Sequence, residues 1–156
     1  MTRSTQTRER RCEWIMGKIE EDKAIIRRFS KEVWNEGNME VFKEIFASNF
    51  VYRDPAAPKA NSLEDYRQFV SRIRTTWPDM HYTIEDMIAE GDKVVARYTW
   101  LATHQKVFRG IPPTGRQVTH PGVAIYRFAG DKVVELWDIW DALGLYQQIG
   151  LVEMKG

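Results

Sequence analysis

The spacing of apolar residues changes once along this chain, near Pro78, and this change limits the fold more than any other feature. Before Pro78 the apolar residues recur every three or four positions, which predicts helices over roughly residues 13–36, after Asn38, and from Ser62 to Trp77. After Pro78 the composition is typical of strands, rich in Val, Tyr, Thr and Trp, over residues 80–89, 94–104, 117–128 and 133–140. Helices followed by antiparallel hairpins predict an α+β fold, with the helices on one face of a curved sheet.

Local signals mark the ends of these helices. Gly37 is a stop for the first helix, and Asn38 can cap the second, with Glu40 in its first turn. Ser62 begins the third helix, with Asp65 as a variant of the capping box. Each of the three helices therefore has at least one end that a single residue predicts.

The bulk composition indicates one domain and excludes several classes of protein. The 156 residues suit a single domain, which we place at residues 13–156, after a mobile tail at residues 1–12. The formal net charge of +1 argues against nucleic-acid binding, and no apolar run approaches the ~20 residues that span a membrane. Cys12 is the only cysteine, which excludes an internal disulfide and fits a cytoplasmic location.

The last predicted strand contains the most informative residue, Asp138. Leu136, Asp138 and Trp140 share one face of this strand by alternation, and the opposite face is also largely apolar. A carboxylate among apolar side chains must be paired or have a raised pKa, and a raised pKa suits a group that exchanges protons near neutral pH. The alternative interpretation is that Asp138 is exposed at a strand end or accepts a hydrogen bond from a backbone amide.

Other polar residues in the strands are weaker candidates. Arg97 lies in an apolar strand, so it could orient a pocket carboxylate or bind a substrate carbonyl; alternatively it reaches the sheet edge and pairs with a surface acid. His104 and His120 flank the loop at residues 105–116, which places both near a pocket mouth. Arg127 and Glu135 lie at matching places across the last hairpin and predict a cross-strand ion pair.

No motif indicates a metal or a cofactor. The three histidines lack metal-ligand spacing, and the chain has neither a G-x-G-x-x-G motif nor a phosphate-binding loop. We therefore expect no metal ion and no cofactor.

The chain has a high aromatic content, 12%, which suits an apolar cavity for a flat ligand. The candidate lining residues are Trp34, Tyr52, Trp100, Phe108, Trp137 and Trp140. The alternative for each of them is ordinary core packing. The loop at residues 105–116 combines a rigid Pro112–Pro113 pair with glycines at 110 and 115, and we predict that it forms a lid, with Phe108 closing on the ligand.

Three segments together resemble a known family. They are residues 34–55, containing Trp-Asn-Glu-Gly-Asn-Met and Asn-Phe-Val-Tyr-Arg-Asp-Pro; residues 108–116, Phe-Arg-Gly-Ile-Pro-Pro-Thr-Gly-Arg; and residues 130–150, beginning Gly-Asp-Lys-Val-Val-Glu-Leu-Trp-Asp. The combination resembles the SnoaL-like polyketide cyclases, also called ester cyclases, within the nuclear transport factor-like superfamily. The resemblance covers roughly residues 20–151.

The resemblance implies a cone-shaped barrel, a strongly curved antiparallel sheet packed on three N-terminal helices with the pocket between them. In the aromatic polyketide cyclases of this family, an Asp on the final strand removes a proton from a carbon activated by carbonyls, and an aldol ring closure follows without a metal or cofactor. That Asp corresponds to Asp138. A pocket Asn of the family corresponds to Asp54, and a His on the penultimate strand corresponds to Ala124.

The resulting hypothesis is an enzyme that acts on a small, mostly apolar carbonyl compound, by aldol-type cyclisation or isomerisation. Asp138 is the predicted base and then acid, Asp54 and His120 are its predicted polar partners, and the predicted substrate-binding residues are Tyr52, Arg97, Phe108 and Trp140. The alternatives are a hydratase, dehydratase or epoxide hydrolase-like activity, and a ligand-binding module without turnover. We also expect a homodimer formed through the outer sheet face, because strands 94–104 and 133–140 look apolar on both faces.

Overall fold

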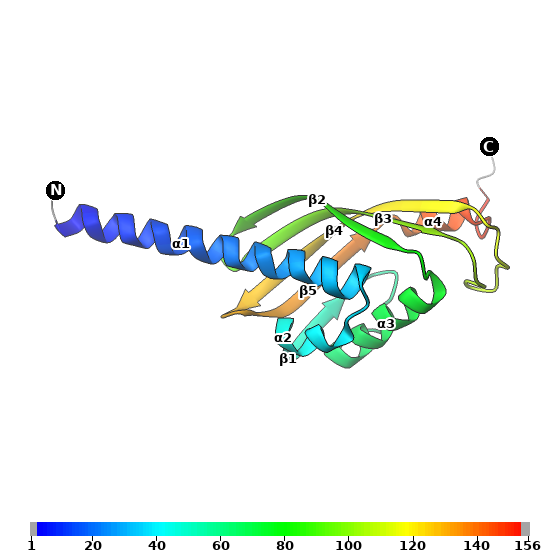
Figure 1. The fold of residues 1–156 in the computed structure, drawn as a ribbon, viewed down its shortest axis with the longest axis horizontal. Coiled ribbons are helices and arrows are strands. Elements are labelled where there is room, and N and C mark those ends of the chain that lie inside the picture. Colours follow the sequence, from blue (N-terminus) through cyan, green and yellow to red (C-terminus); the bar gives the residue numbers. More distant parts are fainter. Residues whose placement is uncertain (1–2, 154–156) are drawn as a thin grey trace.

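The computed structural model describes residues 3–153 and consists of helices packed against one curved sheet (Figure 1). Its helices are α1 (Arg3–Arg28), the π-helix η1 (Phe29–Asn35), the 3-10 helix η2 (Met39–Val41), α2 (Phe42–Ile45), α3 (Leu63–Thr76) and α4 (Ala142–Gln148). Its strands are β1 (Phe46–Arg53), β2 (His81–Glu90), β3 (Lys93–Thr103), β4 (Gln117–Ala129) and β5 (Lys132–Trp140). The predicted α+β class is confirmed.

The sheet has the strand order β1-β5-β4-β3-β2. The four strands β2 to β5 form the antiparallel meander that the sequence predicts, while β1 pairs in parallel with β5. The sequence analysis predicted no strand before Pro78, so this fifth strand is an addition. It forms because Phe46, Phe50 and Tyr52 are buried on one face of β1, beside the equally apolar β5.

The first helix is longer than expected. We predicted a start near residue 13, but α1 begins at Arg3, so residues 3–12 of the predicted tail are helical. Residues 3–16 contain neither Gly nor Pro, and their Arg, Gln and Glu residues favour helix without tertiary contacts. The side chains of residues 6–16 are exposed, and this part of α1 projects past the sheet (Figure 1).

The π-helix η1 carries the chain from α1 into the core. It buries Phe29, Val33 and Trp34, and short π-helical stretches of this kind occur often at functional sites. The side chain of Asn35 fixes η1 to the start of β2, because it accepts a hydrogen bond from the Tyr82 backbone N–H at 2.8 Å and donates one to the Tyr82 carbonyl at 3.0 Å. Trp34 and Tyr82 consequently stack, with ring centroids 5.7 Å apart.

The predicted helix signals are present in the structure. Gly37 has a φ of 77° after η1, and the Asn38 side chain accepts a hydrogen bond from the Glu40 N–H at 3.3 Å. Ser62 and Asp65 form the reciprocal capping box of α3. Between residues 3 and 153, no helix has the length and apolar character needed to cross a membrane.

Alternation along the strands separates the sheet into an inner and an outer face. Along β4 every second residue from Val118 to Phe128 is buried under the helices. On the outer face, the predicted ion pair between Arg127 and Glu135 is confirmed at 3.4 Å, and Arg53 of β1 joins it at 3.0 Å from Glu135. The inner face therefore supplies both the core and the walls of any pocket.

Candidate active site

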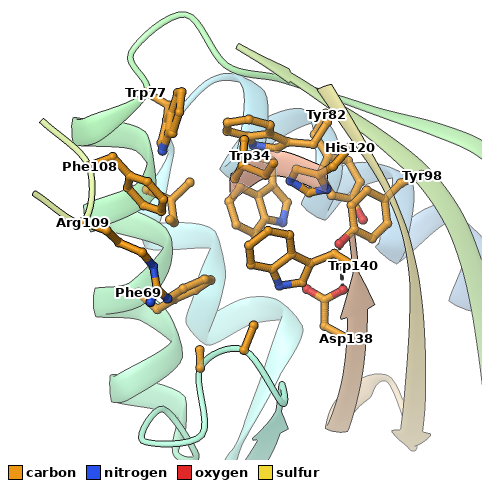
Figure 2. Close-up of a pocket in the computed structure, with 15 residues that line it drawn as sticks. Trp34, Phe69, Trp77, Tyr82, Tyr98, Phe108, Arg109, His120, Asp138 and Trp140 are labelled. Carbon is orange, nitrogen blue, oxygen red and sulfur yellow. Dashed lines mark hydrogen bonds between the residues drawn. The ribbon is translucent and has the colours of Figure 1, made fainter. Parts of the chain in front are cut away.

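A cavity of about 120 Å³ lies between the inner face of the sheet and the helices. Figure 2 shows two walls that face each other: Tyr98, His120, Asp138 and Trp140 project from the strands, and Phe69, Trp77, Phe108 and Arg109 come from α3 and the loops. Most of the lining is aromatic, so the cavity suits a flat and mainly apolar ligand.

Of the carboxylic acids in residues 3–153, Asp138 is the one that lines this cavity. It lies on β5 between Leu136 and Trp140, is only 8% exposed, and accepts a hydrogen bond of 2.8 Å from the Tyr98 hydroxyl. Burial raises the pKa of Asp138 to about 7, the hydrogen bond from Tyr98 opposes this, and the nearby charge of Asp54 adds to it. Asp138 therefore has the proton affinity of a general base at neutral pH.

The Tyr98 side chain reaches Asp138 over Gly122, which lies between their strands and has no side chain to block the way. Tyr98 on β3 is paired with Gly122 on β4, and Gly122 is paired with Trp140 on β5. A Cβ atom at Gly122 would lie 2.3 Å from Cζ and 2.4 Å from the hydroxyl oxygen of Tyr98. The sequence analysis missed Tyr98, although a Gly inside a strand is a known sign of close approach.

Asp54 lies behind the cavity wall, is 5% exposed, and accepts hydrogen bonds through both of its oxygens. Its Oδ1 accepts from the Ala56 N–H at 2.7 Å, while Oδ2 accepts from the Tyr52 hydroxyl at 3.0 Å and from Trp140 Nε1 at 3.1 Å. Asp54 therefore positions the Trp140 ring, and its charge acts on Asp138. Tyr52 is also buried behind the wall, so neither residue touches the space that a ligand would fill.

His120 lines the cavity between two tryptophans. Its ring stacks on Trp100 at 5.0 Å and lies 4.7 Å from the Trp140 ring. Burial lowers the pKa of His120 to about 4, so the imidazole is neutral at pH 7. Its Nδ1 lies 3.3 Å from the Pro121 carbonyl, which can only accept, so the proton sits on Nδ1 and Nε2 is left as an acceptor.

Arg97 lies outside the cavity. It is exposed on the outer face of β3, because its neighbour Tyr98 points inward and successive strand residues alternate. The expectation that Arg97 contacts the substrate or opposes Asp138 is therefore not met by its position. Trp137 is likewise on the outer face, 44% exposed. His104 is wholly buried beside Trp77 and does not line the cavity.

The loop at residues 105–116 borders the cavity, as predicted for a lid. Phe108 and Arg109 both line it, and the Phe108 ring contacts that of Trp77 edge-on at 5.3 Å. The two predicted turn glycines, Gly110 and Gly115, have φ values of 80° and 69°. The loop is tied to α3 by Lys106, whose Nζ donates to the Thr75 carbonyl at 2.7 Å. Opening and closing of this loop stays a prediction.

The described residues provide no cluster for a metal ion. Among residues 3–153, no three side chains of His, Cys, Asp or Glu come close enough together to share one. What the cavity contains instead is a buried acid, two tyrosines, a neutral imidazole and several indoles. Such a set can move a proton and hold a carbonyl compound.

A comparison with protein families decides the relationship. The family model described as SnoaL-like polyketide cyclase matches residues 24–149. The chain belongs to this family. The resemblance inferred from three segments is thereby confirmed, and the match includes every residue discussed above as part of the cavity. No curated protein matches the chain in a sequence comparison.

Solved structures of similar proteins agree with this assignment. A candidate polyketide cyclase from Acidithiobacillus ferrooxidans is 34% identical, with 85% of this chain and 96% of that chain covered and a TM-score of 0.75. AclR, a candidate hydroxylase from Streptomyces galilaeus, is 27% identical, with 86% and 99% covered and a TM-score of 0.77. IdmH, a candidate polyketide cyclase from Streptomyces antibioticus, is 27% identical, with 83% and 98% covered and a TM-score of 0.74. The likeness supports a fold used for small-molecule cyclase or hydroxylase-type chemistry.

Proposed function

We propose that this SnoaL-like protein catalyses cofactor-free acid/base chemistry on a small, mostly apolar carbonyl compound, either an aldol-type cyclisation or an isomerisation. The observation that carries the proposal is Asp138, a carboxylic acid with a pKa of about 7 that lines an aromatic cavity. A base of this strength, held in an apolar site, matches the demands of abstracting a proton next to a carbonyl.

The proposed reaction begins with ionised Asp138. The carboxylate takes a proton from a substrate carbon next to a carbonyl: the C–H bond breaks, an O–H bond forms on Asp138, and the electron pair moves into an enolate. In a cyclisation, the enolate carbon then attacks a second carbonyl of the same molecule. Protonated Asp138 returns its proton to the new alkoxide, so the enzyme is restored without a co-reactant.

Neighbouring residues support these steps. Burial and the negative charge of Asp138 keep the pKa of the Tyr98 hydroxyl well above its usual range, so Tyr98 remains a donor that orients the carboxylate throughout. His120 Nε2 can accept a hydrogen bond from a substrate hydroxyl, since its Nδ1 is turned to Pro121. The aromatic walls offer water few hydrogen-bond partners, which favours an apolar ligand beside Asp138.

Asp54 provides a reason to prefer proton transfer over hydration. A hydratase with paired carboxylates needs a second carboxylate that is free to hold a water molecule. Among the described residues, Tyr52, Ala56 and Trp140 donate hydrogen bonds to Asp54, and Asp54 does not line the cavity. Asp54 is therefore better suited to position Trp140 than to activate water.

The proposal is tested by hydrogen exchange into aryl ketones. In D2O, the protein is expected to accelerate loss of the α-C–H signal of at least one ketone in a panel, as followed by NMR. Because only ionised Asp138 is a base, kcat/KM should rise about tenfold per pH unit below pH 7 and level off above it. A ketone that binds in the cavity without any accelerated exchange would favour the ligand-binding alternative instead.

The outer sheet face supports the proposal that the protein is a homodimer. Leu101, Val123, Ile125, Trp137 and Ile139 are between 37% and 53% exposed there, although these residues are large and apolar. A second copy would cover this surface.

We expect light scattering to give a dimer mass at micromolar concentration, and Trp137→Glu to give a monomer. Trp14→Glu, which changes an exposed tryptophan on α1, should leave the dimer intact; a monomeric wild type would contradict the proposal.

A further inference from the structure

Arg109 occupies a backbone conformation that Arg rarely adopts. Arg109 and Gly110 are the central residues of a two-residue turn, closed by Phe108 N–H to the Ile111 carbonyl at 3.1 Å and Ile111 N–H to the Phe108 carbonyl at 2.9 Å. Both have positive φ, 49° and 80°, as in a type I′ turn, where Asn, Asp or Gly is the usual first residue. Among residues 3–153, Arg109 is the only non-glycine with a positive φ.

The side chain of Arg109 is held against ring faces. Its guanidinium carbon lies 4.9 Å from the centre of the Tyr146 ring and 5.8 Å from that of Phe108. No ion pair or hydrogen bond within the described part of the chain joins Arg109 to a carboxylate. Stacking fixes the plane of a guanidinium while its N–H groups stay available in that plane. The side chain points into the mouth of the cavity, opposite Asp138 (Figure 2).

The surroundings of Arg109 are cationic. A groove of about 500 Å³ continues outward from the cavity and shares Ala56, Phe69 and Arg109 with it. Of the charged residues described in this part of the chain, those that line the groove are Lys59, Arg72 and Arg109, and none is acidic. Asp65 lies beside Lys59 and Arg72 in a neighbouring pocket; it accepts hydrogen bonds from the Ser62 and Asn61 N–H groups, and the charge of Arg72 also lowers its pKa.

The same wall contains a second free donor. Trp77 is wholly buried and lines the cavity, yet its Nε1 has no hydrogen-bond acceptor among the described residues. A buried N–H without an acceptor is unfavourable, so an oxygen atom of a ligand would stabilise it. The side of the cavity next to the loop at residues 105–116 thus has two donors, Arg109 and Trp77 Nε1, while the strand side carries the base.

We propose that the natural ligand carries an anionic group, a carboxylate or a phosphate, which Arg109 binds at the mouth of the cavity. The planar guanidinium matches either group through paired hydrogen bonds, and Lys59 and Arg72 add to the local positive field. The ligand then lies with its reacting carbon at Asp138 and its charged end at the lid. Only this orientation rests on the proposed function; the anion site itself does not require turnover.

Calorimetric titration with three flat probes tests the proposal: 2-naphthoate, 2-naphthyl phosphate and its neutral counterpart, methyl 2-naphthoate. At least one anion should bind the wild type about tenfold or more tightly than the ester, and the tighter anion identifies the group. Arg109→Gln should bring the anions to within about twofold of the ester without changing the affinity for the ester. Lys31→Gln, which removes an exposed positive charge on η1 that does not line the cavity or the groove, should keep the preference.

Arg109→Gly separates binding from folding. Glycine adopts positive φ readily, so this variant relaxes the turn and removes the guanidinium at the same time. We expect an unchanged or higher Tm together with loss of the preference for the anion. A large fall in Tm with the preference retained would show that Arg109 stabilises the fold by packing on Tyr146 and does not bind the anion, and would overturn the proposal.

The remaining outcomes of the titrations also test whether Arg109 binds an anion. The proposal is wrong if the ester binds the wild type as tightly as both anions, if the preference survives in Arg109→Gln, or if none of the probes binds at millimolar concentration. Ketone exchange without an anion preference would leave the proposed function standing and remove this inference. An anion preference without exchange on any ketone would do the reverse.

Discussion

Asp138→Asn is expected to reduce turnover by roughly 100-fold or more while the protein stays folded. The amide has nearly the shape of the carboxyl and its oxygen can accept the hydrogen bond from Tyr98, but it cannot take a proton from the substrate. Ketone exchange measured at pH 8, where wild-type Asp138 is mostly ionised, gives the largest difference. Binding of the neutral ketone should change little, because the walls of the cavity are unaltered.

The same variant is expected to change how stability depends on pH. In the folded protein the pKa of Asp138 is about 7, while an unperturbed Asp has 3.8, so between these values the folded state binds one more proton than the unfolded state. The free energy of unfolding of the wild type therefore falls as pH rises from about 4 to about 7, and this contribution is constant above that. The total is on the order of 4 kcal/mol.

Asn does not titrate and lacks this dependence. The stability of Asp138→Asn relative to the wild type should therefore be greater at pH 8 than at pH 5. The buried amide N–H groups of Asn need hydrogen-bond acceptors that the carboxyl did not need. Leaving them unpaired costs about 1–3 kcal/mol, which offsets part of the stability gained at pH 8. A net gain of about 1–3 kcal/mol at pH 8 remains, measurable by urea unfolding. Asp131→Asn, in the exposed turn before β5, is the matched control and should show no such trend. If Asp138→Asn unfolds the protein or leaves exchange untouched, Asp138 is structural and the proposed mechanism fails.

The sequence predicted those features that depend on local pattern. The capping box at Ser62, the stop at Gly37 and the meander of four strands follow from neighbouring residues alone, and each is present. Asp138 was identified because its environment follows from alternation within one strand, and the structure confirms that it is buried. The pairing of β1 with β5 was not predictable in this way, because it joins segments about 85 residues apart in the chain.

The differences between the predicted and the observed positions of the site residues have the same origin. Arg97 was assigned to the pocket from the composition of its strand, but the face on which a residue lies depends on register, and a shift of one position exchanges Arg97 for Tyr98. Tyr52 and Asp54 are close to Asp138 yet behind the wall, a distinction that only packing can make. Arg109 was not predicted as a site residue. Its position at the cavity depends on a positive φ and on stacking against Tyr146, which is 37 residues later in the chain.

Gly122→Ala is expected to be strongly disruptive, although it adds a single methyl group. The new Cβ would lie 2.3 Å from the Tyr98 ring, which cannot move easily because Tyr98 is 3% exposed and stacks on Tyr82 at 4.3 Å. Overpacking of this kind typically destabilises by about 1–3 kcal/mol. Displacement of Tyr98 would also break its hydrogen bond to Asp138 and leave buried polar groups unpaired, for another ~1–3 kcal/mol. We therefore expect a total loss of about 2–6 kcal/mol in urea unfolding.

The effect of Gly122→Ala on catalysis has a defined direction. The hydrogen bond from Tyr98 lowers the pKa of Asp138, so its loss should raise that pKa further and move the midpoint of the pH–rate profile above 7. Tyr98→Phe removes the same hydrogen bond without adding a clash, and should move the midpoint in the same direction with a smaller loss of stability. Val123→Ala, next to Gly122 but on the exposed outer face, should leave the midpoint in place. A Gly122→Ala protein with wild-type stability and an unmoved midpoint would mean that the strands separate enough to admit the methyl group, and that the gap at Gly122 does not position Tyr98.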